Sequence, residues 1–301
     1  MRKGRRFTPA RLNRWVDRGR GVGTGAEYEP WHQVTRDDPG SRGRSHLIRW
    51  RFGRLHHLLS DQELIAFGFA TMLPNLIDLR EQFPLATETH PHELARYRVA
   101  MRGQTYPGTL AIAEELGYMH PVVHAGSHKA SWTFSTDLLL TVATNAGSLE
   151  LLAISVKADE ELSNERKLQL LAIERDYWLR QDVCWLLLTP SLFAQAVAVG
   201  VRAGLPWVLG DEVGQVSDEE RHALGAIRGG STLQSCLAQL AGKLQLDIHA
   251  AQRTFWRAVW AGILPIDLAR VLRPSDTLRL LPGADFWDQN PLVSRRTAWS
   301  R

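Results

Sequence analysis

The stretch 135–157, STDLLLTVATNAGSLELLAISVK, constrains the fold most, because it places charges at the two ends of an apolar hairpin. If the turn centres on residue 146, strand partners have numbers that sum to about 292, and Asp137 lies opposite Ser155. Lys157 lies two residues further along and points to the same face. A charge beside an apolar sheet is costly unless it is paired or binds a metal. The sequence therefore predicts that Asp137, Ser155 and Lys157 converge.

Two interpretations of these charges stay open. Asp137 and Lys157 can form an ion pair at a strand end, which usually contributes little to stability, or they can belong to a site. Glu63 has a similar ambiguity, since Ser60-x-x-Glu63 is a capping box in which the glutamate satisfies a backbone N–H.

The rest of the chain predicts a mixed α/β sheet flanked by helices, because helical and strand periodicities alternate. We expect a hairpin or short strands at 45–60, a helix from Ser60 that stops before Pro74, a strand at 76–85, a helix around 109–117 within an insertion at 86–130, an amphipathic helix within 159–181 and a strand at 183–189.

Beyond about residue 205 we expect two helices, in the segments TLQSCLAQLAGKLQ and IHAAQRTFWRAVWAGIL. Asp247 would cap the second helix. A hairpin around Pro274-Ser275-Asp276 would complete a winged-helix-like α+β domain. Trp256 and Trp260 fit the core of that domain better than a base-stacking surface. The expected division is a basic arm at 1–44, a catalytic domain at 45–204 and the C-terminal domain at 205–301.

Positive charge is concentrated at the amino end. Residues 1–57 hold 14 Arg or Lys against 5 Asp or Glu, whereas the whole chain has a net charge of only +4. Such an arm indicates a polyanionic partner, with a solvated tail as the alternative. GRGVGTG (19–25) is a weak match to a phosphate loop and better fits a flexible linker or a DNA-tracking arm. We expect phosphate contacts from Arg18, Arg20, Arg42, Arg44 and His46.

Composition also bears on the compartment. No apolar run approaches the roughly 20 residues that span a bilayer, and the basic amino end lacks the apolar stretch of a signal peptide. Cys184 and Cys236 have no metal-binding spacing and predict reduced core thiols in a cytoplasmic protein.

The histidines are weaker candidates. His56 and His57 could contact phosphate or metal but fit ordinary structural hydrogen bonding better. His120, His124 and His128 have helical metal-site spacing, but Pro121 and Gly126 interrupt that helix, so we expect them in loops.

Several segments together resemble the TnsA family, the endonuclease subunits of heteromeric cut-and-paste transposases, which have a restriction-endonuclease-like fold. The resemblance covers roughly residues 10–190 and continues more faintly to about residue 275. The segments that carry it are GRGVGTGAEYEPW (19–31), GRSH (43–46), GRLHHLLSDQEL (53–64), DLREQFPL (78–85), TDLLL (136–140), AISVK (153–157) and ERDYW (174–178).

The resemblance implies a catalytic site of Glu63, Asp137 and Lys157, with the two carboxylates binding Mg²⁺, for which Mn²⁺ substitutes. Lysine would orient the attacking water, accept its proton or stabilise the developing charge. The family has Gln or Glu two residues before the lysine, where this chain has Ser155. Ser155 would be a weaker third metal ligand than Gln or Glu. Otherwise water, Glu174 or a backbone carbonyl substitutes for it, or the metal affinity is reduced.

The implied function is cleavage of the 5′-ended, non-transferred strand of double-stranded DNA at transposon ends, in the prokaryotic cytoplasm at the nucleoid. The implied partners are a DDE-type transposase, TnsB, and an AAA+ regulator, TnsC, which the C-terminal domain contacts. One alternative is a catalytically degenerate subunit that bridges the two partners. The other is a winged-helix DNA-binding regulator, which leaves the Glu–Asp–Lys set unexplained.

Overall fold

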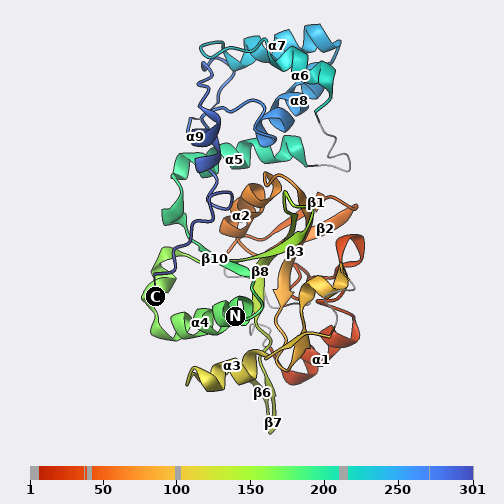
Figure 1. Cartoon of the computed structure of the whole chain (residues 1–301), viewed down its shortest axis with the longest axis vertical. Coiled ribbons are helices and arrows are strands. Elements are labelled where there is room, and N and C mark those ends of the chain that lie inside the picture. The colour runs from red at the N-terminus through yellow and green to blue at the C-terminus, as the bar shows by residue number, and fades with distance from the viewer. Residues whose placement is uncertain are drawn as a thin grey trace.

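A four-stranded mixed sheet forms the centre of the protein (Figure 1). The computed structural model describes residues 7–36, 38, 43–98, 103–209, 216–270 and 272–300. The strand order is β10-β9-β8-β3, with β10 parallel to β9 and the other neighbours antiparallel. The strands are β3 (Leu76–Pro84), β8 (Ser135–Ala143), β9 (Leu149–Val156) and β10 (Cys184–Leu188). The predicted mixed sheet is confirmed.

The register of the central hairpin also agrees with the prediction. Leu138 lies opposite Ile154 and Ala143 lies opposite Leu149, so the partner numbers sum to 292. An apolar strand pair joined by one short turn has few alternative registers, because a slip of one residue would move every side chain to the other face.

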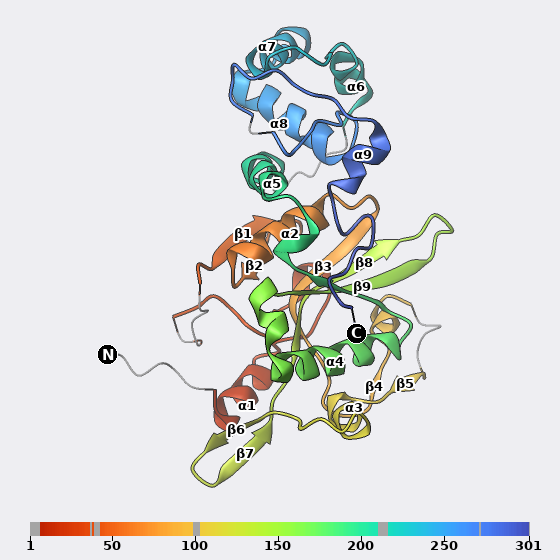
Figure 2. The same ribbon diagram turned by 90° about the vertical axis from the view of Figure 1, so that its left-hand side faces the viewer.

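Helices cover both faces of the sheet because its apolar side chains alternate between two cores (Figure 2). Leu138 and Leu140 pack in the core formed with α2 (Asp61–Thr71) and α5 (Gln195–Val208). Leu139 packs in the second core, with α4 (Glu165–Leu179). The sheet, with the charged residues at the ends of its strands, therefore lies between two packed layers of helices.

The amino-terminal segment folds onto this body. Helix α1 (Pro9–Asp17) begins at Thr8, whose side chain accepts from the Arg11 N–H. Trp15 and Trp31 are both buried, with their ring centroids 5.2 Å apart. The expectation of a flexible arm is wrong for the described part of 1–44, because these aromatic rings bury a small core of their own.

Smaller elements surround the sheet. They are the hairpin β1 (His46–Trp50) and β2 (Arg54–Leu58), the short pair β4 (His90–Pro91) and β5 (Thr105–Tyr106), helix α3 (Thr109–Glu115), and the hairpin β6 (Val122–Ala125) and β7 (His128–Ser131). The expected loop position of the last two histidines is wrong: His124 lies in β6 and His128 in β7.

The C-terminal part is helical, as expected, and contains α6 (Asp218–Leu224), α7 (Leu233–Leu244), α8 (Ile248–Trp260) and α9 (Gly283–Asp288). Asp247 caps α8, and Trp256 and Trp260 are buried. In place of the expected hairpin around residue 274, the described residues have isolated antiparallel bridges, Thr232 with Thr277 and Ile266 with Leu280.

The two parts of the molecule share one core. Helix α5 crosses the expected boundary at 204/205 and packs on α2 below and α8 above (Figure 1). A Cβ at Gly68 would lie 2.4 Å from Val201, and one at Gly204 would lie 2.5 Å from Trp256. Glycine is needed at both positions for the helices to approach this closely.

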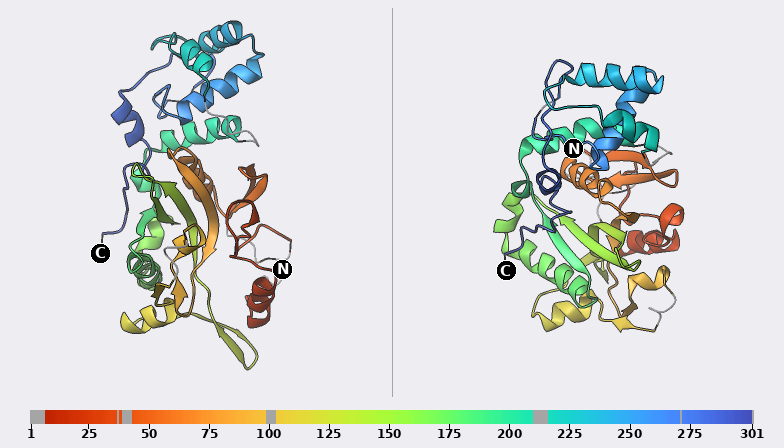
Figure 3. Two further views of the ribbon diagram at one scale, coloured as in Figure 1. Left: turned by 45° about the vertical axis from the view of Figure 1, so that its right-hand side comes forward. Right: turned by 45° about the horizontal axis from the view of Figure 1, so that its top comes forward.

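The last residues return to the sheet and cover its edge (Figure 3). The Ala298 N–H donates to the Leu187 carbonyl at 2.9 Å, and Thr297 Oγ1 accepts from the Leu187 N–H at 3.0 Å. Trp299 packs edge-on against Trp185. An uncovered strand edge is a site for unwanted pairing, and the tail satisfies part of β10.

Two further observations concern membrane-spanning helices and the cysteines. Among the described residues, no helix is long and apolar enough to cross a bilayer. Both cysteines are free, but only Cys236 is buried, so the core position expected for Cys184 at the start of β10 is wrong.

Candidate active site

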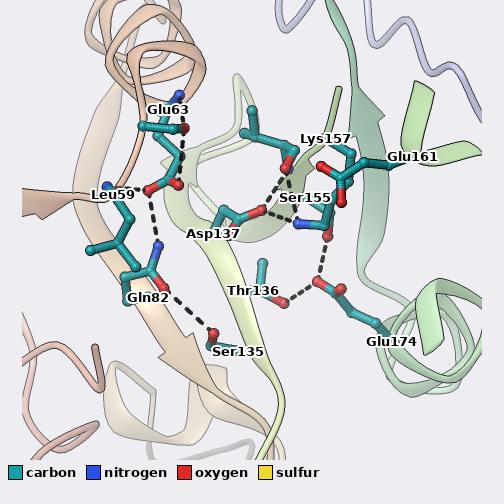
Figure 4. Close-up of polar contacts among 12 residues, drawn as sticks. Leu59, Glu63, Gln82, Ser135, Thr136, Asp137, Ser155, Lys157, Glu161 and Glu174 are labelled. Carbon is teal, nitrogen blue, oxygen red and sulfur yellow. Dashed lines mark hydrogen bonds and ion pairs between the residues drawn. The ribbon is translucent and has the colours of Figure 1, made fainter. Parts of the chain in front are cut away.

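The Asp137 carboxylate and the Lys157 ammonium meet where the central hairpin ends (Figure 4). Asp137 Oδ2 accepts from the Val156 N–H at 2.6 Å and from Lys157 Nζ at 2.7 Å. The Lys157 backbone N–H donates to the Leu188 carbonyl at 3.0 Å, which holds the lysine beside β10. Both bonds to Asp137 end on Oδ2, so within the described part of the chain Oδ1 is left for a ligand.

The surroundings of Lys157 keep it protonated. Burial lowers the pKa of its ammonium, but the negative charges of Asp137 and Glu174 raise it by more, so the pKa lies above the ordinary range. About a quarter of the side chain (26%) remains exposed, which leaves it accessible to a ligand. Lys157 is therefore a cation at neutral pH in this structure.

Glu63 caps its own helix and also faces the site. Its N–H donates to Ser60 Oγ at 3.1 Å, as in a capping box, but its Oε2 accepts from the Leu59 N–H at 2.8 Å and from Gln82 Nε2 at 3.0 Å. Burial, followed by the negative charge of Asp137, raises the pKa of Glu63 to about 7. Capping and a place beside Asp137 are thus compatible.

Gln82 lies on β3, between helix α2, which carries Glu63, and strand β8, which carries Asp137, and it was not predicted from the sequence. The ladder between β3 and β8 leaves out the pair Gln82 and Asp137. Gln82 has φ of 49°, a left-handed conformation that is uncommon outside glycine. Its amide donates to Glu63 and makes a longer, 3.5 Å contact with Ser135 Oγ. The available signal was its place in DLREQFPL (78–85), one of the segments that carry the family resemblance.

Ser155 is bonded to Glu174 rather than to Asp137. Its fully buried hydroxyl donates to Glu174 Oε1 and accepts from Trp185 Nε1 at 3.1 Å. Thr136 Oγ1 donates to the same Glu174 oxygen at 2.7 Å. The predicted convergence holds for Asp137 and Lys157, while the serine hydroxyl holds a carboxylate from α4 against the sheet (Figure 4).

A cavity of about 240 Å³ opens onto these groups. Asp137, Lys157 and Glu174 contribute its charged wall. The remaining lining residues are Trp132, Phe134, Ser135, Glu161, Lys167, Leu170 and Leu171. Glu161 pairs with Lys167 at 2.6 Å, so the mouth of the cavity also carries both signs of charge.

The donor set fits a hard divalent cation. Within the described residues, there is no group of three or more His, Cys, Asp or Glu side chains that are close enough together to hold a metal ion. Burial, followed by the charge of Asp137, raises the pKa of Glu63, so the two carboxylates are close enough to interact electrostatically. Mg²⁺ takes few protein carboxylates and keeps several waters, so two oxygens from the chain meet its requirement.

Arg20 does not lie where its expected role requires. Its guanidinium is buried and bonds Asp38 at 2.8 and 3.3 Å and the Trp31 carbonyl at 3.1 Å. A buried arginine with paired nitrogens cannot reach a phosphate without losing those bonds. We therefore assign Arg20 a structural role.

The other expected phosphate contacts differ in placement. Arg18 and Arg44 are exposed. His46 is partly buried, and its Nε2 lies 2.7 Å from Asp61 Oδ1. Arg42 lies outside the described residues.

His56 and His57 have structural partners on the neighbouring strand. His56 Nδ1 lies 2.9 Å from Glu81 Oε2, and the His57 N–H donates to Glu81 Oε1 at 3.0 Å. Arg54 also donates to both oxygens of Glu81. Burial raises the pKa of Glu81, but the charges of His56 and Arg54 outweigh it and hold the pKa at about 2. This cluster fixes β2 against β3.

Comparison with known proteins places this geometry in a context. The model of a family described as "TnsA-like endonuclease N terminal" matches residues 74–190, which include Asp137, Lys157 and Glu174. The Escherichia coli protein "Transposon Tn7 transposition protein TnsA" is 32% identical over 214 residues, which cover 71% of this chain and 67% of that protein.

Proposed function

Because this chain belongs to the TnsA family of transposition endonucleases, we propose that it is a metal-dependent nuclease that cuts the 5′-ended, non-transferred strand at transposon ends. The observation that carries the proposal is the contact between Asp137 and Lys157 beside the buried Glu63. A structural ion pair alone would not need a second buried carboxylate whose pKa is raised by the first.

The residues divide the chemistry between them. Lys157, a cation at neutral pH, stabilises the negative charge that develops on the scissile phosphate. Glu63 and Asp137 would hold Mg²⁺ or Mn²⁺, which when bound supplies Lewis-acid polarisation of the phosphate and a lowered pKa for water. Gln82 orients the Glu63 carboxylate through its amide.

We also propose that Glu174 contributes the oxygen that Ser155 is too short to provide. Glu174 lines the cavity with Asp137, and its carboxylate is held by Ser155 and Thr136. Burial raises the pKa of Glu174, and the nearby Lys157 charge opposes that rise. A cation in the cavity would favour the ionised form further.

The protein partners are proposed to be a DDE-type transposase (TnsB) and an AAA+ regulator (TnsC), and the C-terminal part, residues 205–301, is proposed to dock the regulator. The order of α6, the Thr232 bridge, α7, α8 and the Ile266 bridge supports the proposal of a winged-helix-like domain with a reduced wing. Helix α8, the counterpart of a recognition helix, is buried along much of its length. A covered helix cannot enter a DNA groove, which weighs against the regulator alternative.

The degenerate-subunit alternative rests on Ser155. Its hydroxyl is committed to Glu174 and Trp185, so a position that usually supplies a ligand supplies none directly. In that case the chain would bridge its partners without cutting.

A strand-specific cleavage assay distinguishes these functions. Transposon-end duplexes, labelled in turn at each strand, are incubated with the full chain, the partner transposase and Mg²⁺. We expect wild type to nick the 5′-ended strand, whereas Asp137→Asn and Lys157→Ala lose the nick and leave 3′-end joining intact. A wild type that assembles but does not nick supports the bridging subunit. Equal nicking by Asp137→Asn contradicts the proposed site.

A further inference from the structure

The hairpin of β6 and β7 projects from the body of the molecule beside α1 (Figures 2 and 3). It forms a two-stranded sheet of its own, separate from the central sheet. Gly126 and Ser127 make the turn, and Gly126 has φ of 61°, as two-residue hairpin turns require. All six residues from 124 to 129 are exposed.

The foot of this hairpin is firmly anchored. Val123 and Trp132 pack against the small core of Leu12, Trp15 and Trp31. The centroid of the Trp132 ring lies 4.7 Å from that of the Phe7 ring. The backbone N–H of Trp132 donates to the Pro121 carbonyl at 2.9 Å, across the foot of the hairpin. Isolated two-stranded hairpins are marginally stable in water. A packed foot that carries a fully exposed tip indicates an element whose tip contacts something outside the chain.

The chemistry of the tip suits a polyanion. Residues 119–131 contain no Asp or Glu. His124 pairs with Lys129 across the strands, and His128 pairs with Ala125, so the donors gather at the tip. The adjacent α1 exposes Arg14, and Arg18, which directly follows α1, is exposed as well. Imidazole, ammonium and guanidinium groups all donate hydrogen bonds to phosphate, and arginine and lysine also bind guanine in the major groove.

The hairpin is also tied to the cleavage site. Trp132, at its foot, lines the same cavity as Asp137 and Lys157. Ten residues separate Ser127 from Asp137, which limits the distance between tip and site to about 35 Å. That limit is about one helical turn of B-DNA, ~34 Å.

We propose that the β6–β7 hairpin enters the major groove of duplex DNA within about one turn of the bond cleaved at Asp137 and Lys157. The inference rests on the proposed nuclease function. The major groove admits a two-stranded β-ribbon, and the exposed part of this hairpin is a narrow ribbon that carries donors and no acidic side chain. The hairpin positions the duplex, while Asp137 and Lys157 act on the phosphate.

Photo-crosslinking from the tip tests the proposal. Ser127 is replaced by a photoreactive amino acid in the full chain, assembled with the partner transposase on a transposon-end duplex in Ca²⁺. The control carries the same group at Lys243, exposed on α7 at the far end of the molecule. We expect residue 127 to crosslink DNA within about one helical turn of the cleaved bond, and residue 243 to give no DNA crosslink there. Crosslinks from 127 to protein alone, or none, overturn the proposal.

Salt dependence gives a second readout. Lys129→Ala should lower the slope of log affinity against log salt by about 1, whereas Lys243→Ala should leave it unchanged. Equal slopes for both variants count against groove contact by the hairpin. Cleavage is measured in the same samples with Mg²⁺. An intact nick without the crosslink overturns the hairpin's role alone, and a crosslink without any nick overturns the nuclease function alone.

Discussion

At the scale of single residues, the site depends on how buried charges are balanced. Lys157 compensates Asp137 directly. Glu63 accepts hydrogen bonds from the neutral groups of Leu59, Ser60 and Gln82, and the Lys157 charge lowers its pKa only in part. Hydrogen bonds to a carboxylate favour its ionised form, yet burial dominates here. The protonation of Glu63 therefore responds to pH near neutrality and to a nearby cation.

Metal affinity should depend on pH through Glu63. Burial and the Asp137 charge raise its pKa to about 7, so below that pH a cation must displace a proton. We expect Mg²⁺ affinity, measured by calorimetry, to rise about tenfold from about pH 6 to about pH 8 and then level off. Glu63→Gln should bind weakly and show no such rise. A pH-independent affinity in the wild type would contradict this assignment.

Glu81 should control acid stability. Its pKa of about 2 lies below the ordinary value of 4.5, so its stabilisation is complete above about pH 4.5 and is lost as the pH falls towards 2. Glu81→Gln leaves Arg54 and His56 without their anion and should reduce the free energy of unfolding at pH 7 by about 3–5 kcal/mol. The acid dependence below pH 4.5 should also flatten, as measured by urea denaturation.

The matched control for Glu81 is Glu150→Gln, which removes a half-exposed partner of Arg295. A surface pair contributes at most about 1 kcal/mol. Similar losses of unfolding free energy for the two variants would show that burial of the Glu81 cluster adds nothing to the stability of the protein.

At the scale of elements, strand periodicity and turn position predicted the central hairpin and its register, because both are local properties of 135–157. The contact between Ser155 and Glu174 could not be predicted in the same way. It depends on how α4 is rotated on the sheet, which is set by packing of Leu171 and Trp178 into the second core. From the sequence, Glu174 was therefore predicted only as a metal ligand that could substitute for Ser155.

Helix α5 was not predicted, since its glycines and Pro206 weaken a helical pattern. Packing explains its glycines. A Cβ at Gly204 would lie 2.5 Å from both Trp256 and Trp260. Gly204→Ala should therefore lower the free energy of unfolding by about 1–3 kcal/mol, measured from the urea midpoint.

The control for Gly204 is Gly242→Ala on the exposed side of α7, where a Cβ meets nothing within 4 Å. Alanine there should stabilise by up to about 1 kcal/mol through helix propensity. Stabilisation by both substitutions would refute the tight approach of α5 and α8.

At the scale of the whole molecule, the C-terminal tail is connected to the candidate active site through a series of side-chain contacts. Trp299 packs on Trp185, whose Nε1 donates to Ser155, which in turn holds Glu174. The N-terminal segment provides a second long-range connection, since its aromatic core carries Trp132 at the cavity wall. The site is thus built from segments that are distant in sequence.

Trp299→Ala should weaken this arrangement. Loss of the ring contact with Trp185 should cost about 1–2 kcal/mol in the free energy of unfolding and lower the melting temperature. Trp299→Phe keeps an aromatic ring and should recover much of the loss. Equal melting temperatures for wild type and Trp299→Ala would show that the tail does not stabilise the edge of the sheet.

The most direct test of the central claim is sulfur substitution at the scissile phosphate, measured as the rate of 5′-strand cutting by the complex with its transposase. Each non-bridging oxygen is replaced by sulfur in turn. If Glu63 and Asp137 hold a cation against that phosphate, one sulfur isomer should be cut poorly in Mg²⁺ and recover in Mn²⁺, the softer ion. Asp137→Asn should show no recovery, and Glu150→Gln should match wild type. Equal cutting of both isomers in either metal, or recovery in Asp137→Asn, would contradict a metal-dependent site at these residues.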